Sequence, residues 1–127
     1  RWLDPLARAG VDIFHASQRR FWEPEYAGDP KNLGGWIKDV TGKPVITVGS
    51  IGMDRDLMQD FVEGISSPML GRLEDLAAMF ERGEFDLVAL GRVLLADPNW
   101  LEKVEQRRID ELTPYDRTTA LKQYEHD

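Results

Sequence analysis

Three short apolar runs alternate with helical patterns along the chain. The runs are VDIFHA from Val11, VITV from Val45 and LVAL from Leu87. Each run is almost continuously apolar, which is typical of parallel strands that are covered on both faces. Strands that alternate with helices indicate βαβ units with right-handed crossovers and a parallel sheet. The sequence therefore predicts an α/β fold.

The segments between the runs carry apolar residues at helical spacing. In NLGGWIKDVTG, the residues Leu33, Trp36, Ile37 and Val40 share one stripe, and Gly42 is the predicted stop. Further helices are predicted from Asp54 to Gly64 and over Leu73, Leu76, Ala77 and Phe80. Another is predicted to start at Asp97-Pro98 and to include Trp100, Leu101, Val104 and Ile109, and a last one to start at Thr113-Pro114.

Three strands are too few for a closed sheet. A three-stranded parallel sheet leaves two edges and an apolar face open, whereas a complete eight-stranded barrel needs ~250 residues. We therefore interpret residues 1–127 as an incomplete domain, the carboxy-terminal segment of a TIM (β/α)8 barrel with about its last three β/α units. Its expected partner is the missing amino-terminal half of the barrel or another copy of the chain.

Composition excludes several classes of function. The 23 acidic and 16 basic residues give a formal charge of -7, which disfavours nucleic acid, because binding to nucleic acid depends on Lys and Arg at the phosphates. The chain has no cysteine and only two histidines, His15 and His126, so neither thiolate chemistry nor a histidine-rich metal site is expected. No apolar run approaches the ~20 residues of a membrane span. These features favour a reducing, cytoplasmic location.

Two of the apolar runs end in a glycine followed by a hydrogen-bond donor, as Gly49-Ser50 and Gly91-Arg92. Glycine lets an anion approach backbone N–H groups, and the guanidinium of arginine matches phosphate oxygens. In barrels, a common phosphate site lies after the seventh and eighth strands. The spacing alone is thus compatible both with a phosphate site and with glycines that serve as simple turn residues at strand ends.

The order of three motifs resembles the Old Yellow Enzyme family. These are GVDIFHASQRRFWEPEY, then VTGKPVITVGSIG, then RGEFDLVALGRVLLADPNWLEKV, and together they cover roughly residues 5 to 108. The resemblance implies an FMN-binding TIM barrel in a flavin-dependent NAD(P)H oxidoreductase of the ene-reductase type, which passes hydride through flavin to an activated alkene or similar acceptor. It also implies that Gly49, Ser50, Gly91 and Arg92 bind the FMN phosphate.

The same resemblance leaves the catalytic residues outside the chain. The proton-donor tyrosine and substrate-binding histidine of the family lie mostly in the amino-terminal half, so no catalytic residue is assigned here, and the isolated chain is expected to be inactive. Phe21 and Trp22 are predicted either to wall the substrate pocket or to pack as ordinary core residues. His15 is predicted to be a buried structural histidine. Arg19 and Arg20 are compatible with a role as pocket cations, but they are rather expected to be solvated or paired with Glu23 and Glu25.

Two other interpretations remain open at this point. The chain is compatible with a different phosphate-binding barrel, because one fold supports many chemistries. It is also compatible with a non-catalytic, truncated barrel module that self-associates through its open sheet edges.

Overall fold

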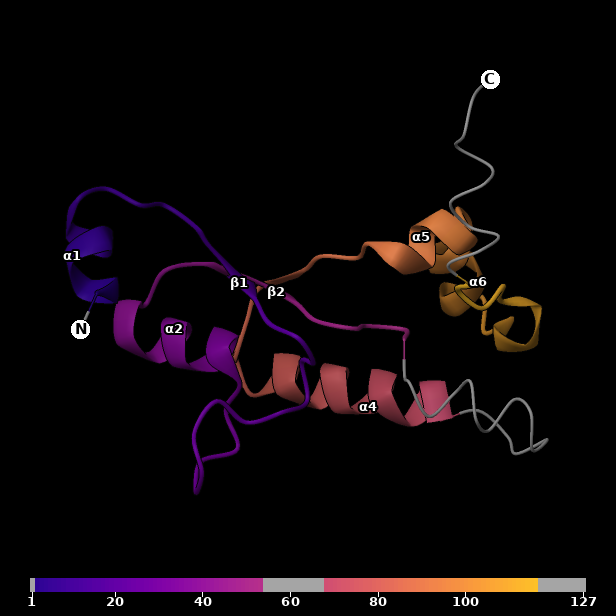
Figure 1. Cartoon of the computed structure of the whole chain (residues 1–127), viewed down its shortest axis with the longest axis horizontal. Helices are drawn as coiled ribbons and strands as arrows, with labels where there is room; N and C mark the ends of the chain where they lie inside the picture. Colours follow the sequence, from indigo (N-terminus) through magenta and orange to yellow (C-terminus); the bar gives the residue numbers. More distant parts are fainter. Residues whose placement is uncertain (1, 54–67, 117–127) are drawn as a thin grey trace. The chain divides into compact units, whose positions relative to one another are not determined.

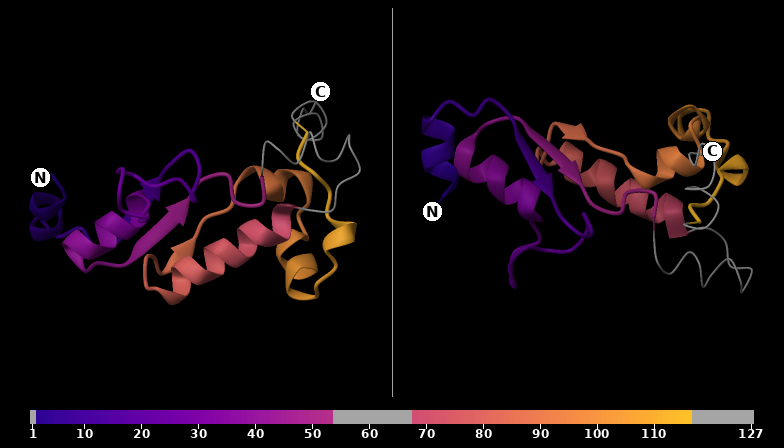
Figure 2. Two further views of the ribbon diagram at one scale, coloured as in Figure 1. Left: turned by 90° about the horizontal axis from the view of Figure 1, so that it is seen from below. Right: turned by 45° about the horizontal axis from the view of Figure 1, so that its top comes forward.

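The predicted strands form one parallel sheet (Figures 1 and 2). The computed structural model of the chain describes residues 2–53 and 68–116. Strands β1 (Phe14–Ser17), β2 (Val45–Val48) and β3 (Leu87–Val88) are hydrogen-bonded in the order β1-β2-β3. In this register, Phe14 pairs with Val45 and Ile46 pairs with Leu87. The α/β class with parallel strands is confirmed, and the sheet is open, so its place in a TIM barrel stays a prediction.

The two outer strands are shorter than predicted. The first was expected from Val11 but starts at Phe14, whose N–H donates to the Pro44 carbonyl at 3.0 Å. The third was expected to reach Leu90, but its last bond to β2 is from Ala89 N to Thr47 O at 2.9 Å. Because the central strand has only four residues, its neighbours have partners over that length alone.

Burial alternates along β1, contrary to the expectation that both faces of the sheet are covered. Phe14 and Ala16 are buried, whereas His15 is exposed. Both residues of β3 are exposed as well, Leu87 at 55% and Val88 at 38%. The reason is that α2 (Leu33–Thr41) packs on β1 and β2. Among the described residues, no other helix packs as closely on the opposite face of the sheet.

Helix α2 ends where the sequence predicted but turns a slightly different face inward. Gly42 adopts a left-handed conformation, with φ of 65°, and its N–H donates to the Lys38 carbonyl. Ile37 is buried as expected, but Val40 is 52% exposed and leaves the predicted stripe. Helix α2 also contacts α1 (Leu3–Arg8).

The inward face of α2 includes the two buried glycines, Gly34 and Gly35. A Cβ atom on Gly34 would lie 3.4 Å from Thr47 Oγ1 and 3.5 Å from Val45 Cγ1. Glycine weakens a helix, but at Gly34 it lets α2 approach β2 closely. The two distances to β2 are ordinary van der Waals contacts, so tertiary packing restricts this position to a small residue.

Helix α4 (Pro68–Glu81) also differs from its predicted stripe. Leu76 and Met79 are buried together with Phe85, whereas Ala77 is exposed. Phe80 is 54% exposed and touches Phe85 only obliquely, with ring centroids 5.8 Å apart. The helix predicted over residues 54–64 lies outside the described residues.

The chain divides into two compact units, Arg1–Ala89 and Leu90–Asp127, and the elements above belong to the first. The second contains α5 (Arg92–Ala96), α6 (Trp100–Glu105) and the 3-10 turn η1 (Ile109–Glu111), with Trp100 buried. The helix predicted to reach Ile109 stops early because Arg107 has a left-handed φ of 58°. Thr113-Pro114 starts no helix up to residue 116. Across the ranges that the structure describes, no helix has the length and apolar character needed to cross a membrane.

Candidate functional site

The loop that follows β1 is held by a buried polar cluster. Gln18 Nε2 donates to Thr47 Oγ1 at 3.2 Å, and Gln18 Oε1 accepts from the Leu33 N–H at 3.0 Å. Asn32 accepts from the Gly35 N–H at 2.9 Å and donates to a loop carbonyl, also at 2.9 Å. Two N–H groups at the amino end of α2 are therefore bound by protein side chains rather than left for an anion.

Neither Gln18 nor Asn32 was predicted as a functional residue from the sequence. Asn32 carried a usable signal, because asparagine directly before an apolar helical stripe is a preferred N-cap. Gln18 carried none, since its partners Thr47 and Leu33 come from distant parts of the chain.

Gly49 and Ser50, two of the predicted phosphate ligands, are closely joined to the same loop. The Phe21 N–H donates to the Gly49 carbonyl at 3.0 Å. Ser50 has a left-handed φ of 54°, and its hydroxyl donates to the Arg19 carbonyl at 2.8 Å. The hydroxyl proton of Ser50 is thus already used in a hydrogen bond within the protein. Ser50 therefore has a structural contact in addition to its predicted role as a phosphate ligand.

Gly91 and Arg92, the other predicted ligands, belong to the second compact unit. Gly91 is exposed, and a Cβ atom there would meet no atom within 4 Å. Arg92 is the first residue of α5, which forms as the predicted helical turn, and its side chain is exposed. The guanidinium carbon lies 5.8 Å from the centroid of the Tyr115 ring. Among the described residues, Arg92 makes no ion pair.

The two aromatic residues of the predicted substrate pocket differ in exposure. Phe21 is only 1% exposed, as expected of a core residue, and it meets Trp22 edge to face with centroids 5.2 Å apart. Trp22 is half-buried, and the guanidinium carbon of Arg72 lies 4.5 Å from its ring centroid. A pocket role for either residue stays a prediction.

The polar residues near β1 agree only partly with expectation. His15 was predicted to be buried but is exposed, because its face of the sheet is not covered. Arg20 pairs with Glu23 at 2.6 Å, as expected, while Arg19 is exposed.

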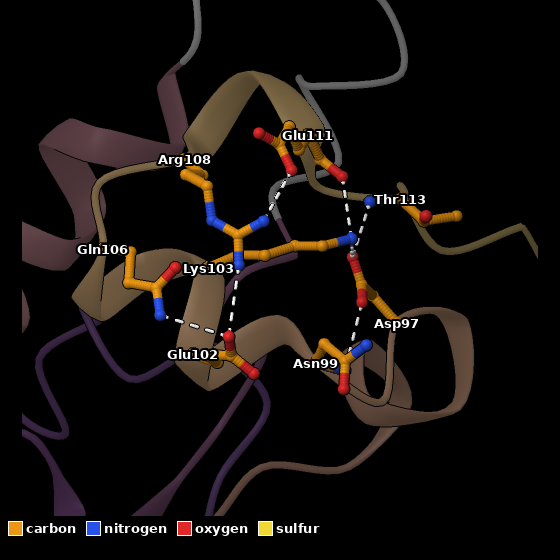
Figure 3. A network of polar contacts seen from close by, with 8 residues as sticks. All are labelled: Asp97, Asn99, Glu102, Lys103, Gln106, Arg108, Glu111 and Thr113. Atoms are coloured by element: carbon orange, nitrogen blue, oxygen red, sulfur yellow. Dashed lines mark hydrogen bonds and ion pairs between the residues drawn. The ribbon is translucent and has the colours of Figure 1, made fainter.

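Asp97 organises the second unit (Figure 3) and was predicted only as a helix cap. Its side chain is 4% exposed. Oδ2 accepts from Lys103 Nζ at 2.7 Å and from the Thr113 N–H at 3.0 Å, and Oδ1 accepts from the Asn99 N–H at 3.1 Å. Burial raises the pKa of Asp97, but these hydrogen bonds, first that of Lys103, outweigh burial and hold the pKa below its ordinary value.

No family model matches the chain, but curated proteins are similar to it. A bilirubin reductase of Mediterraneibacter gnavus (strain CC55_001C) is 30% identical over 105 residues, which are 79% of this chain and 14% of that protein. An NADH oxidase of Thermoanaerobacter brockii is 31% identical over 115 residues, 84% of this chain and 15% of that protein. The chain therefore spans only a small part of the length of these relatives.

Proposed function

We propose that this chain is part of an NAD(P)H-dependent oxidoreductase and that it contributes the phosphate-binding part of an FMN site. The names of both relatives describe oxidoreductases, which supports the general class. The resemblance of its motifs to the Old Yellow Enzyme family adds the finer proposals of a TIM barrel and an ene-reductase type of reaction. The proposed phosphate ligands are those that the resemblance implies, Gly49, Ser50, Gly91 and Arg92.

The state of Arg92 carries this proposal. Five other arginines of this acidic chain pair with carboxylates, namely Arg8, Arg20, Arg72, Arg82 and Arg108. Within the described residues Arg19 and Arg107 make no ion pair either, but neither of them follows a glycine at the end of a strand. Arg92 is exposed, follows an exposed glycine and makes no such pair within the described residues. A guanidinium whose donors have no carboxylate partner among the described residues suits the planar, two-point recognition of phosphate oxygens.

The donor set fits a phosphate and leaves the redox chemistry to the cofactor. Arg92 would neutralise part of the charge, and Gly91 would leave the backbone N–H accessible because it has no side chain. Bound FMN would supply hydride transfer from NAD(P)H to an activated alkene or similar acceptor. The role of these residues is thus to bind and orient, and no residue of the chain is assigned a proton-transfer step.

Replacing Arg92 with alanine is expected to weaken FMN binding by about tenfold or more, since a hydrogen bond to a charged group contributes about 1.5–3 kcal/mol. Titration of the 127-residue chain with FMN, followed by flavin fluorescence, measures this loss. Riboflavin, which has no phosphate, should bind more weakly than FMN and should be unaffected by the substitution.

Arg107→Ala is the matched control, because Arg107 is also an exposed arginine of the second unit. It removes the same charge from a residue that follows no strand. If Arg107→Ala weakened FMN binding as much as Arg92→Ala, or if FMN and riboflavin bound equally well, a phosphate site at Arg92 would be excluded.

A second candidate function is self-association as a non-catalytic module. It is favoured by β3, which pairs only with β2 in the described part of the chain and exposes both of its apolar side chains, Leu87 and Val88. An unpaired apolar edge strand is a template for pairing with another chain.

Sedimentation velocity distinguishes this candidate. If the edge pairs with a second copy, the wild-type chain sediments as a dimer or larger species, and Leu87→Lys shifts it to the monomer. Leu101→Lys is the control, because Leu101 is equally exposed at 55% but lies on helix α6. If the wild-type chain remained a monomer at high protein concentration, self-association through the sheet edge would be excluded.

A further inference from the structure

The segment after η1 is held against the start of α6 by Asp97 and Lys103 (Figure 3). Asp97 Oδ2 accepts from the Thr113 N–H at 3.0 Å. Lys103 Nζ donates to the same carboxylate oxygen and to the Glu111 carbonyl, at 2.7 and 2.9 Å. Since Asp97 directly follows α5, these three contacts fix the path of residues 111–113 relative to that helix.

Tyr115 follows this anchored segment by two residues and reaches back to the first residue of α5. Its half-buried ring lies 5.8 Å from the guanidinium carbon of Arg92. A guanidinium within about 6 Å of an aromatic centroid is attracted by the negative face of the ring. This attraction is to the ring face and involves no hydrogen-bond acceptor. The ring therefore restrains the side chain of Arg92 without using its hydrogen-bond donors.

We propose that Tyr115 is a positioning residue that holds the Arg92 guanidinium ready to bind an anionic phosphate. This inference rests on the proposed function of Arg92 as a phosphate ligand. An exposed arginine has many rotamers and loses their entropy when it binds. A ring that already restricts the side chain lowers that cost, which is the usual benefit of preorganisation.

The size of the effect follows from the contact. Cation–π attraction at an exposed site is about 0.5–1 kcal/mol. This corresponds to about a two- to fivefold change in affinity for phosphate-bearing ligands. The effect should depend on the aromatic face and not on the tyrosine hydroxyl.

The test compares Tyr115→Phe, which keeps the ring, with Tyr115→Leu, which keeps an apolar side chain without one. FMN affinity and inorganic phosphate affinity should be retained in Tyr115→Phe and fall about two- to fivefold in Tyr115→Leu. In NMR spectra of the free chain, the Arg92 Nε–Hε resonance should carry a ring-current shift that only Tyr115→Leu removes. An unchanged Thr113 amide resonance confirms that the anchored segment is intact.

The outcomes separate this inference from the function on which it rests. If the wild-type chain binds FMN no better than riboflavin, or if Arg92→Ala binds FMN as well as wild type, the phosphate site fails and Tyr115 has nothing to position. If that site holds but Tyr115→Leu binds like wild type, only the positioning role is wrong. An equal loss in Tyr115→Phe and Tyr115→Leu assigns the effect to the hydroxyl and also overturns the role of the ring.

Discussion

Replacing Asp97 with asparagine is expected to destabilise the carboxy-terminal unit by about 3 kcal/mol, because breaking one partner of a buried ion pair leaves the other without a counter-charge. The ammonium group of Lys103 belongs to a side chain that is only 17% exposed and would lose its carboxylate. Asparagine would also place an NH2 group against one of the N–H donors, Asn99 or Thr113. Amide hydrogen exchange in α6 measures the loss, since it reports the free energy of opening of that unit.

Glu102→Gln is the matched control for Asp97→Asn. Glu102 accepts from Arg108 in the same network, at 3.3 Å, but its side chain is 57% exposed. Exposed ion pairs contribute about 0–1 kcal/mol, so exchange in α6 should change little. Equal effects of the two substitutions would show that burial of Asp97 is not what stabilises the unit.

The pH dependence of the stability of the carboxy-terminal unit is an independent test of the contribution of Asp97. The folded pKa lies below the ordinary value of 3.8, because the hydrogen bonds to the carboxylate outweigh the opposing effect of burial. A carboxyl group with a depressed folded pKa contributes stability above its unfolded pKa, and this contribution is lost as the pH falls through the folded pKa. In the wild-type chain, the protection of α6 amides against hydrogen exchange should therefore decrease when the pH is lowered below about 3.8. The Asp97→Asn variant should lack this part of the pH dependence.

Gly49→Ala is expected to destabilise the amino-terminal unit by about 2–4 kcal/mol, since both backbone strain and overpacking oppose it. Gly49 has φ of 156°, and a Cβ atom there would lie 2.8 Å from the Gln18 carbonyl oxygen and 3.0 Å from Phe21 N. Both are backbone atoms, which cannot rotate away as a flexible side chain would. Urea denaturation followed by circular dichroism measures the change.

Gly42→Ala separates strain from steric conflict. Gly42 has a left-handed φ of 65°, but a Cβ atom there would meet nothing within 4 Å. The expected cost is therefore only about 1–2 kcal/mol of left-handed strain. If Gly42→Ala destabilised the chain as much as Gly49→Ala, close approach of the loop would not be the reason for glycine at position 49.

The sequence predicted the parts of the fold that local pattern determines. β2 has its predicted bounds, and α2 stops at Gly42, because a β-branched run and a left-handed glycine are strong local signals. Partners from elsewhere in the chain determined the rest. His15 is exposed because nothing in the described residues covers its face, and α6 stops before its predicted end because Arg107 turns the backbone.

The candidate site was predictable to a similar degree. Gly91 and Arg92 were predicted as phosphate ligands because a glycine and an arginine after an apolar run are visible in sequence, and this role stays a prediction. The contact of Tyr115 with Arg92 was not predictable from the sequence. The path of the backbone before Tyr115 depends on the hydrogen bond from the Thr113 N–H to the carboxylate of Asp97, which is distant in sequence. The contact between Ser50 and the Arg19 carbonyl likewise depends on how two loops meet.

The close approach of α2 to β2 also has a consequence for how sequences of this kind can diverge. A Cβ atom on Gly34 would lie 3.3–3.5 Å from atoms of Asn32, Val45 and Thr47. A side chain longer than that of alanine at position 34 therefore requires a smaller neighbour on β2 or a displaced helix. Because Thr47 also binds Gln18, displacement would reach the loop after β1. Positions 34, 45 and 47 are thus expected to vary together among homologues, as one coupled set.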